Sequence, residues 1–379
     1  MRGAAGSAVI KQTYRARQLP SGPGVIPMRA NHTIALRCIL ASLISLLGFA
    51  WLGTAESRAA GEVRQPIAIQ FSFDRPIDAS SAPFVLASVG GLFSAEGLAV
   101  TTNIASGSKD AITRVAADDS DFALVDINEL IRFRDKSGAP RIKAVFVLFN
   151  KQPYAIVARK SRGIRALSDI QGKTLGVAED DLSIRLWPAL ARQYGIKLAS
   201  VKQHKISAAV REPILSAGQV DAVTGFSYSS AVNLRDRGIP ADDLAVFRYA
   251  DYGCEAYGFA VIVNPAFAAA KPEAVKGFVR AVIGGMHLTV RDVGRAVDEV
   301  VNRMDGGSCD LELERLRTLI RDNIVTSEVQ RHGIGGIDPA RFDRSIDQIA
   351  EDFKFQKKPS AADIFDDSFL PPLGGRLIN

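Results

Sequence analysis

Cysteine and histidine are scarce in this chain, which has three cysteines and four histidines among its 379 residues. Cys254 and Cys309 stand alone in the sequence, and no histidine lies near either of them at the spacing of a metal site. Because zinc and iron sites need ligands at short, recurring spacings, we expect no metal site and no cofactor. A disulfide between Cys254 and Cys309 stays open, since the sequence does not show whether the two residues meet.

Long hydrophobic runs are missing as well. The uncharged apolar run at residues 38–52 has about fifteen residues, whereas a membrane-spanning helix needs about twenty. Arg29 and Arg37 precede this run and small residues around Ala59 follow it, a layout typical of an export signal. We therefore predict an upstream extension and a cleavable signal peptide over residues 1–59, and a periplasmic location. A retained membrane anchor is the alternative interpretation.

The body of the chain lacks an excess of charge of either sign. The formal net charge is +6, but the first 59 residues hold seven of the 47 Lys and Arg and one of the 41 Asp and Glu. The remaining chain therefore carries 40 of each kind. A neutral body does not offer the basic surface that nucleic acids require, so no nucleic-acid partner is expected.

Motifs of common enzymes are missing too. The sequence around Ser227 lacks the second glycine of a hydrolase nucleophile elbow. Gly172-Lys173-Thr174 resembles the end of a phosphate loop, but Leu167 stands where the first glycine of that loop is needed. These absences favour a protein that binds a molecule without transforming it.

Alternating strands and helices fill the body of about 320 residues. Apolar runs predict strands at 67–71, 98–104, 121–125, 141–149, 154–158, 174–177, 200–204, 221–224 and 257–263. Helical patterns lie at 82–88, 110–117, 183–194, 208–217, 265–323 and 339–353. Such an order implies two α/β domains, each with a parallel sheet covered by helices.

Residues 167–177 mark the start of the second of these domains. Ser168 or Asp169 can cap a short helical turn, Gly172 can end it with a positive φ, and residues 174–177 form a β-prone run. Farther along, apolar residues recur at helical spacing, which predicts core packing rather than a binding surface. They are Val275, Phe278, Val279, Val282 and Ile283, followed by Leu311, Leu313, Leu316 and Ile320. Trp187, inside a predicted helix, is assigned to the core as well.

Four segments in order resemble a known family: residues 91–100, 121–126, 167–177 and 365–371. The first is similar to that family's entry into its second strand, and the third to the opening of its second domain. The family is the periplasmic substrate-binding proteins of ABC transporters, in the branch for nitrate, alkanesulfonates, taurine and thiamine-pyrimidine precursors. The tail and residues 74–78 resemble the thiamine-pyrimidine side of this branch.

The resemblance implies a bilobal type II periplasmic-binding-protein fold whose domains trap a small molecule as a hinge closes. Domain I would comprise residues 60–155 and 260–379, and domain II residues 156–259. Two crossing strands, 154–158 and 257–263, would join them. The implied partners are a small-molecule ligand and an ABC transporter permease, with contact to the membrane only through that permease.

Ligand groups are expected in loops at the carboxyl ends of strands, where α/β sheets bind small molecules. Asp74 can pair with an amine and Phe73 can stack on a ring, although capping and packing explain both equally well. The candidates of the first domain are Phe73, Asp74, Ser80, Ser106, Ser108, Asp126 and Asn128. Those of the second domain are Asp181, Ser183, Gly225, Phe226 and Tyr228, with Tyr252 as a weaker candidate.

The acids at residues 179–181 bear on the charge of the ligand. They can simply stabilise the start of a helix, and Asp181 or Ser183 can be its cap. Three carboxylates would nevertheless repel an anion, so together with Asp74 and Asp126 they favour a neutral or cationic nitrogenous ligand such as an aminopyrimidine. An alkanesulfonate or nitrate binder is the alternative.

Two other functions remain open. The same fold resembles the fungal thiamine-pyrimidine synthase, an enzyme of thiamine biosynthesis, although the cysteine-rich iron motif of that family is missing here. A ligand-sensing domain for a membrane partner is a third interpretation, because a fold does not fix a function.

Overall fold

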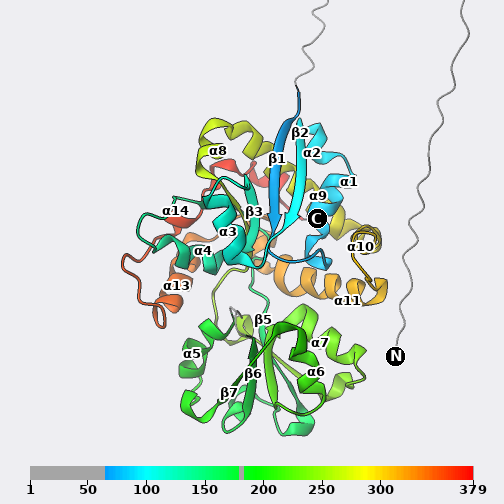
Figure 1. Cartoon of the computed structure of the whole chain (residues 1–379), viewed down its shortest axis with the longest axis vertical. Coiled ribbons are helices and arrows are strands. Elements are labelled where there is room, and N and C mark those ends of the chain that lie inside the picture. Colours follow the sequence, from blue (N-terminus) through cyan, green and yellow to red (C-terminus); the bar gives the residue numbers. More distant parts are fainter. Residues whose placement is uncertain (1–64, 179–182, 379) are drawn as a thin grey trace, which may run out of the picture. The chain divides into compact units, whose positions relative to one another are not determined.

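Two five-stranded sheets organise the protein, whose computed structural model describes residues 65–178 and 183–378 (Figure 1). The first sheet has the order β2-β1-β3-β10-β4 and the second β7-β6-β8-β5-β9. We call the parts built on them the first and the second domain. The strands of the first sheet are β1 (Ile67–Phe73), β2 (Leu98–Ile104), β3 (Phe122–Asp126), β4 (Lys143–Val147) and β10 (Phe259–Val263). Those of the second are β5 (Tyr154–Arg159), β6 (Thr174–Ala178), β7 (Lys202–Ile206), β8 (Ala222–Phe226) and β9 (Leu244–Arg248).

Helices accompany both sheets, in the βαβ order that the sequence predicts (Figure 1). Those that precede the second sheet's strands are α1 (Ala82–Val89), α2 (Leu92–Ala95), α3 (Ser108–Ala116) and α4 (Ile127–Arg134). The next are α5 (Ser183–Gln193), α6 (Arg211–Ser216) and α7 (Ser227–Asp236). The last part of the chain forms α8 (Pro265–Ala270), α9 (Pro272–Arg291), α10 (Val293–Val301), α11 (Cys309–Leu319), α12 (Ser327–His332), α13 (Pro339–Ala350) and α14 (Ala361–Ile364).

The prediction of two α/β domains is confirmed, but both sheets are mixed rather than purely parallel. Strand β10 runs antiparallel to β3 and β4, and β5 runs antiparallel to β8 and β9. Each of these strands follows a passage from the other domain. Strands β10 and β5 thus begin at the edge where the parallel strands end, and they run antiparallel to them.

The predicted crossing strands need a correction for the same reason. Residues 154–158 lie within β5 and residues 259–263 form β10, so both segments belong to a sheet. The passages between the sheets are the segments just before them, residues 148–153 and 249–258. Strand β9 at the edge of the second sheet was not predicted at all.

Aromatic packing on α9 forms much of the first domain's core. Phe278 is fully buried, and its ring stacks on Phe122 of β3 with centroids 4.3 Å apart. Helix α1 lies so close to α9 that a Cβ on Gly285 would come within 1.9 Å of the Pro83 carbonyl oxygen. The predicted core role of Trp187 is confirmed in the second domain, where its side chain is fully buried.

The turn at residues 167–170 forms as the sequence predicts. The Asp169 carboxylate accepts the backbone N–H groups of Arg165 and Ala166, both at 2.9 Å. Gly172 has a φ of +75°, and β6 begins two residues later. These contacts set the direction in which the chain enters the second sheet.

Several expectations fall outside these observations. The predicted signal peptide over residues 1–59 lies outside the described residues, and the domain limits stay a prediction. Within residues 65–178 and 183–378, no helix combines the length and apolar character needed to cross a membrane. Cys254 and Cys309 are both free thiols, so the structure does not pair them.

We predict that Phe278→Ala lowers the free energy of unfolding by about 3–5 kcal/mol, because it removes a buried ring and leaves a cavity. Urea denaturation followed by circular dichroism measures this change. Ile104→Ala is the matched control, since Ile104 is half exposed and should cost under about 1 kcal/mol. Equal losses in the two variants would contradict the assignment of Phe278 to the core.

Candidate ligand-binding site

Residues at the carboxyl ends of the parallel strands lie beside the first residues of the two antiparallel strands, β10 and β5. Phe259, the first residue of β10, pairs with Asp126 at the end of β3. Tyr154, the first residue of β5, pairs with Phe226 at the end of β8. Because a passage from one domain to the other precedes each of these strands, their first residues lie where the two domains meet.

Asp74 anchors the first domain's side of the site. Its buried carboxylate binds the Arg75 guanidinium through two hydrogen bonds of 2.9 and 3.0 Å. The Ser108 hydroxyl donates to Asp74 Oδ2 at 2.6 Å and accepts the Asp126 backbone N–H at 3.0 Å. The loops after β1, β2 and β3 are therefore joined by a chain of polar contacts.

Asp126 lies at the centre of the second polar network and is fully buried. It accepts the backbone and side-chain N–H groups of Asn128, both at 2.8 Å, and the hydroxyl of Tyr154. Asn128 also donates to the Tyr257 carbonyl oxygen at 2.9 Å. Burial raises the pKa of Asp126 to about 6, although the hydrogen bonds from Tyr154 and Asn128 act in the opposite direction.

Aromatic rings meet the Arg75 guanidinium from both domains. Its central carbon lies 4.1 Å from the ring centroid of Phe259 and 4.9 Å from that of Phe226. Phe226 in turn stacks with Tyr154 and Tyr228, at centroid distances of 6.2 and 5.9 Å. Burial alone lowers the pKa of Arg75, but the adjacent Asp74 carboxylate outweighs this effect and leaves the pKa raised.

Tyr228 and Ser80 extend this arrangement. The Tyr228 side chain is 1% exposed and forms a hydrogen bond with Ser80, and burial raises the pKa of its hydroxyl. Gly225, just before the Phe226 ring, is tightly enclosed, because a Cβ there would come within 2.3 Å of Ser230 Oγ. We call the residues of these networks the central cluster: Asp74, Arg75, Ser80, Ser108, Asp126, Asn128, Tyr154, Gly225, Phe226, Tyr228 and Phe259.

Other predicted site residues do not join the central cluster. Phe73 is buried in the first core, with its ring 4.8 Å from that of Phe71. Tyr252 packs edge-on against Tyr194 at 5.1 Å, and the exposed Ser106 uses its amide to bind Asp110 at 2.8 Å. Ser183 is buried at the start of α5, and Asp181 lies outside the described residues. A role of these residues in binding stays a prediction.

Three members of the central cluster were not predicted from the sequence: Arg75, Tyr154 and Phe259. Arg75 lies in the loop of Asp74, but its stacking on Phe226 depends on the approach of the other domain. Tyr154 and Phe259 belong to predicted strands, where a buried aromatic residue is ordinary. An aromatic residue at the start of a crossing strand was the available signal for Tyr154.

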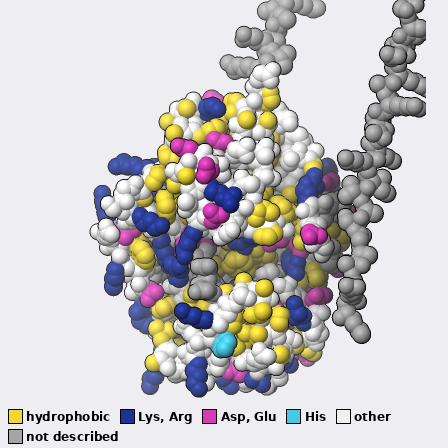
Figure 2. Space-filling view, viewed as in Figure 1, with side chains coloured by type: hydrophobic (Ala, Val, Ile, Leu, Met, Phe, Trp, Pro, Cys, Tyr) yellow, Lys and Arg dark blue, Asp and Glu magenta, His cyan; other side chains and the backbone are white. Residues whose placement is uncertain are grey.

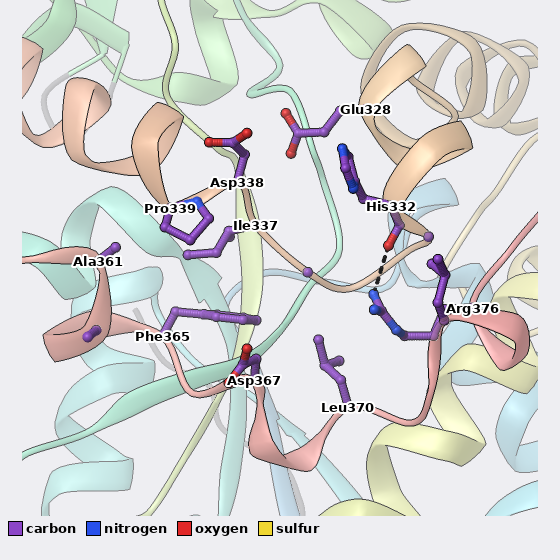
Figure 3. A pocket seen from close by; sticks show the side chains of 14 residues that line it. Glu328, His332, Ile337, Asp338, Pro339, Ala361, Phe365, Asp367, Leu370 and Arg376 are labelled. Carbon is purple, nitrogen blue, oxygen red and sulfur yellow. Dashed lines mark hydrogen bonds between the residues drawn. The ribbon is translucent and has the colours of Figure 1, made fainter.

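A separate hollow in the first domain has a volume of about 430 Å³ (Figure 3). Two of its charged side chains, Glu328 and Arg376, are already used by the fold. Glu328 accepts hydrogen bonds from Tyr257, Asn150 and Arg341 at 2.6–2.9 Å. Arg376 donates to the His332 carbonyl oxygen at 3.1 Å, as the dashed line in Figure 3 shows. In the part of the chain that the structure describes, no group of three or more His, Cys, Asp or Glu gathers as metal ligands would.

Two mixed-sheet α/β domains, linked by two passages of the chain, define the periplasmic-binding-protein class of fold. The aliphatic sulphonate-binding protein SsuA of Escherichia coli has this fold, with a TM-score of 0.62 at 15% identity over 77% of this chain and 95% of SsuA. At such low identity the likeness concerns the fold alone.

Residues 78–293 match the model of the family described as NMT1/THI5 like, and the chain belongs to that family. The riboflavin-binding protein RibY of Chloroflexus aurantiacus is 28% identical over 57% of this chain and 61% of its own length. The 4-amino-5-hydroxymethyl-2-methylpyrimidine phosphate synthase of Legionella pneumophila is 28% identical over 39% of this chain and 46% of its own length. The chain thus matches less than two thirds of either relative.

The raised pKa of Asp126 predicts a specific dependence of stability on pH. An unfolded aspartate titrates near 3.9, so between about pH 4 and pH 6 the folded protein holds a proton that the unfolded chain has released. The contribution of Asp126 to the free energy of unfolding therefore increases as the pH falls from about 7 to about 5, by on the order of 1 kcal/mol. It is lost as the pH rises through 6.

Asp126→Asn should remove this contribution, because an amide does not titrate. Urea unfolding of the wild type and the variant at both pH values measures it, and Asp119→Asn at an exposed site is the control. An Asp126→Asn protein with the wild-type pH dependence would show that another group is responsible.

Proposed function

We propose that this protein is the exported solute-binding component of an ABC importer. It captures a small, flat nitrogenous molecule, of the thiamine-pyrimidine precursor kind, between its two domains and delivers it to a membrane permease. The arrangement of Asp74, Arg75 and Phe226 carries the proposal. It combines a buried carboxylate, a planar cation and an aromatic face from the opposite domain.

The Phe226 face accepts a planar, delocalised cation. A nitrogen heterocycle has the same flat shape, and aromatic rings bind such groups by stacking and by attraction to their positive edges. In the ligand-bound protein the heterocycle takes the place of the guanidinium on Phe226, and Tyr228 lines the same layer. Asp74 and Ser108 then meet the ring nitrogens as hydrogen-bond acceptors and donors.

Contacts between the domains support capture by closure. Arg248 of β9 binds Asp322 at 2.7 Å. Helix α7 meets α11 through Arg235 with Glu314, and through Asn233 with Arg315. Such polar contacts form and break as hinged domains move, which makes them suitable for a reversible clamp. The hinge lies in the two passages between the sheets.

The names of the relatives agree with a heterocyclic ligand. RibY is named for riboflavin, and the Legionella synthase for an aminopyrimidine product. Both molecules contain a flat ring system with several nitrogens. The leading segment with its signal-like layout supports export to the periplasm, where a binding protein meets its permease.

The synthase relative favours one second candidate, an enzyme that forms the pyrimidine of thiamine. A binding protein is preferred because the sulphonate-binding protein SsuA has the same fold and because Arg75 already pairs with Asp74 in the central cluster. Incubation of the purified protein with pyridoxal phosphate and iron, followed by chromatography, tests the enzyme. Release of an aminopyrimidine would overturn the binding-protein proposal.

We predict that a thermal-shift screen finds stabilisation by an aminopyrimidine or a flavin, because a ligand of the folded form raises the melting temperature. Alkanesulfonates and nitrate are included in the screen because they are the ligands of the alternative function. Tight binding of a sulfonate without binding of any heterocycle would contradict the proposal. Calorimetry of the stabilising ligand then gives its affinity.

Phe226→Ala should weaken that affinity about ten- to hundredfold, since stacking of a base on an aromatic ring is worth about 1–3 kcal/mol. Tyr194→Ala removes a comparable ring that is 44% exposed and remote from the central cluster, so it is the matched control. If the two variants bind the ligand with equal affinity, the ligand does not stack on Phe226 and the central cluster is not its binding site.

A further inference from the structure

Beside the central cluster, a hollow of about 410 Å³ opens between α3, α4, α5 and the segment after α13. Five of the side chains that line it are basic and two are carboxylates. In Figure 2, Lys and Arg side chains gather over the part of the first domain where Figure 1 places α3, α4 and α13. The hollow is therefore much more basic than the neutral body of the chain.

Arg132 on α4 is the most deeply placed of these basic groups. Its side chain is 7% exposed, and its one hydrogen bond among the described residues runs from Nη1 to Glu129 Oε1 at 3.5 Å. A guanidinium has five N–H donors, so most of them are left for another acceptor. Burial lowers the pKa of Arg132, and the nearby Arg185 acts in the same direction.

Arg185 reaches the same carboxylate from the second domain. Its Nη1 lies 3.7 Å from Glu129 Oε1, on the atom that Arg132 also contacts. Two guanidiniums thus share one carboxylate, at distances longer than a good charge-assisted hydrogen bond of about 2.8 Å. Among the described residues, one carboxylate therefore faces two guanidiniums, and a second anion would complete the pairing.

The wall of the hollow can hold more than a bare ion. The Phe353 ring lies 5.9 Å from the guanidinium carbon of Arg132, and Phe133 lines the hollow as well. Asp135 fixes this wall by accepting the backbone N–H groups of Gln356 and Lys357 at 3.0 and 2.9 Å. In the described part of the chain, the ion pairs of Arg132 and Arg185 run to Glu129 and not to Asp135.

We propose that this hollow is a second binding site, for the phosphate group of a small aromatic ester or for free phosphate, held by Arg132 and Arg185. Because the two arginines come from different domains, the anion also links the domains. The aromatic wall favours the ester over free phosphate. The site is separate from the central cluster and does not depend on the function proposed for it.

Isothermal titration of the purified, exported protein with phenyl phosphate, inorganic phosphate and phenol tests the proposal. We expect phenyl phosphate to bind more tightly than inorganic phosphate, and phenol not to bind. Arg185→Gln should weaken phenyl phosphate about tenfold or more, since it removes a charge-assisted hydrogen bond. Arg185 is one third exposed, so this variant should fold. Arg132→Lys should also weaken binding, because it keeps the charge and loses the planar donor pair.

Glu129→Gln should have the opposite effect and tighten phenyl phosphate binding severalfold, because it removes the competing carboxylate. A purely structural role of Glu129 would change the melting temperature without raising the affinity. Arg192→Gln is the control. Arg192 lies on α5, like Arg185, but it pairs with Glu351 at 2.8 Å outside the hollow.

Three results would overturn the proposal. The first is a wild-type protein that binds neither phenyl phosphate nor inorganic phosphate. The second is unchanged affinity in both Arg185→Gln and Glu129→Gln. The third is loss of phosphate binding in Phe226→Ala, which would place the anion in the central cluster. Retained binding in Phe226→Ala supports the second site, whether or not a heterocycle binds to the central cluster.

Discussion

The fold depends on a buried carboxylate whose hydrogen-bond donors come from both domains. Removing an isolated carboxylate from water costs several kcal/mol unless donors replace the lost hydration. Asp126 meets part of this demand with the two N–H groups of Asn128 and the hydroxyl of Tyr154, and its raised pKa shows that they do not replace the hydration completely. Asn128 lies in the first turn of α4 in the first domain and Tyr154 opens β5 of the second, so the same carboxylate contacts the starts of two elements. Separation of Tyr154 from Asp126 would remove one of these three hydrogen bonds.

The reversed strands explain why this contact exists. A strand that arrives from the other domain enters at the carboxyl edge, so its first residue stands beside the last residue of a parallel strand. This topology places Phe259 next to Asp126 and Tyr154 next to Phe226. The Arg75 guanidinium then lies against both phenylalanine rings, one from each sheet. The arrangement of the central cluster thus follows from sheet topology rather than from a local motif.

Sequence reasoning located the strand ends but not the contacts between them. An apolar run predicted β3 and helical spacing of apolar residues predicted α9, because these patterns reflect burial within one domain. Asp74, Asp126 and Phe226 of the central cluster were predicted because polar or aromatic residues after buried strands mark the edge of a sheet. Tyr154 and Arg75 were missed because Tyr154 contacts Asp126, and Arg75 contacts Phe226, across the two domains, and spacing in the sequence carries no signal for such pairs. Phe73 was predicted as a binding residue but lies in the first core. Its place at a strand end does not tell which face of the sheet the ring covers.

The balance of charge differs between the central cluster and the hollow around Glu129. In the central cluster, Asp74 is neutralised by Arg75, and Asp126 is held by three donors with a pKa raised to about 6. A ligand there meets little uncompensated charge, and its binding depends on shape, stacking and hydrogen bonds. Around Glu129 the balance is the reverse, because two guanidiniums compete for one carboxylate. An anion in the proposed second site would reduce the repulsion between Arg132 and Arg185. The charge balance therefore agrees with the nitrogenous ring proposed for the central cluster, and an anion in the neighbouring hollow would contact both α4 and α5.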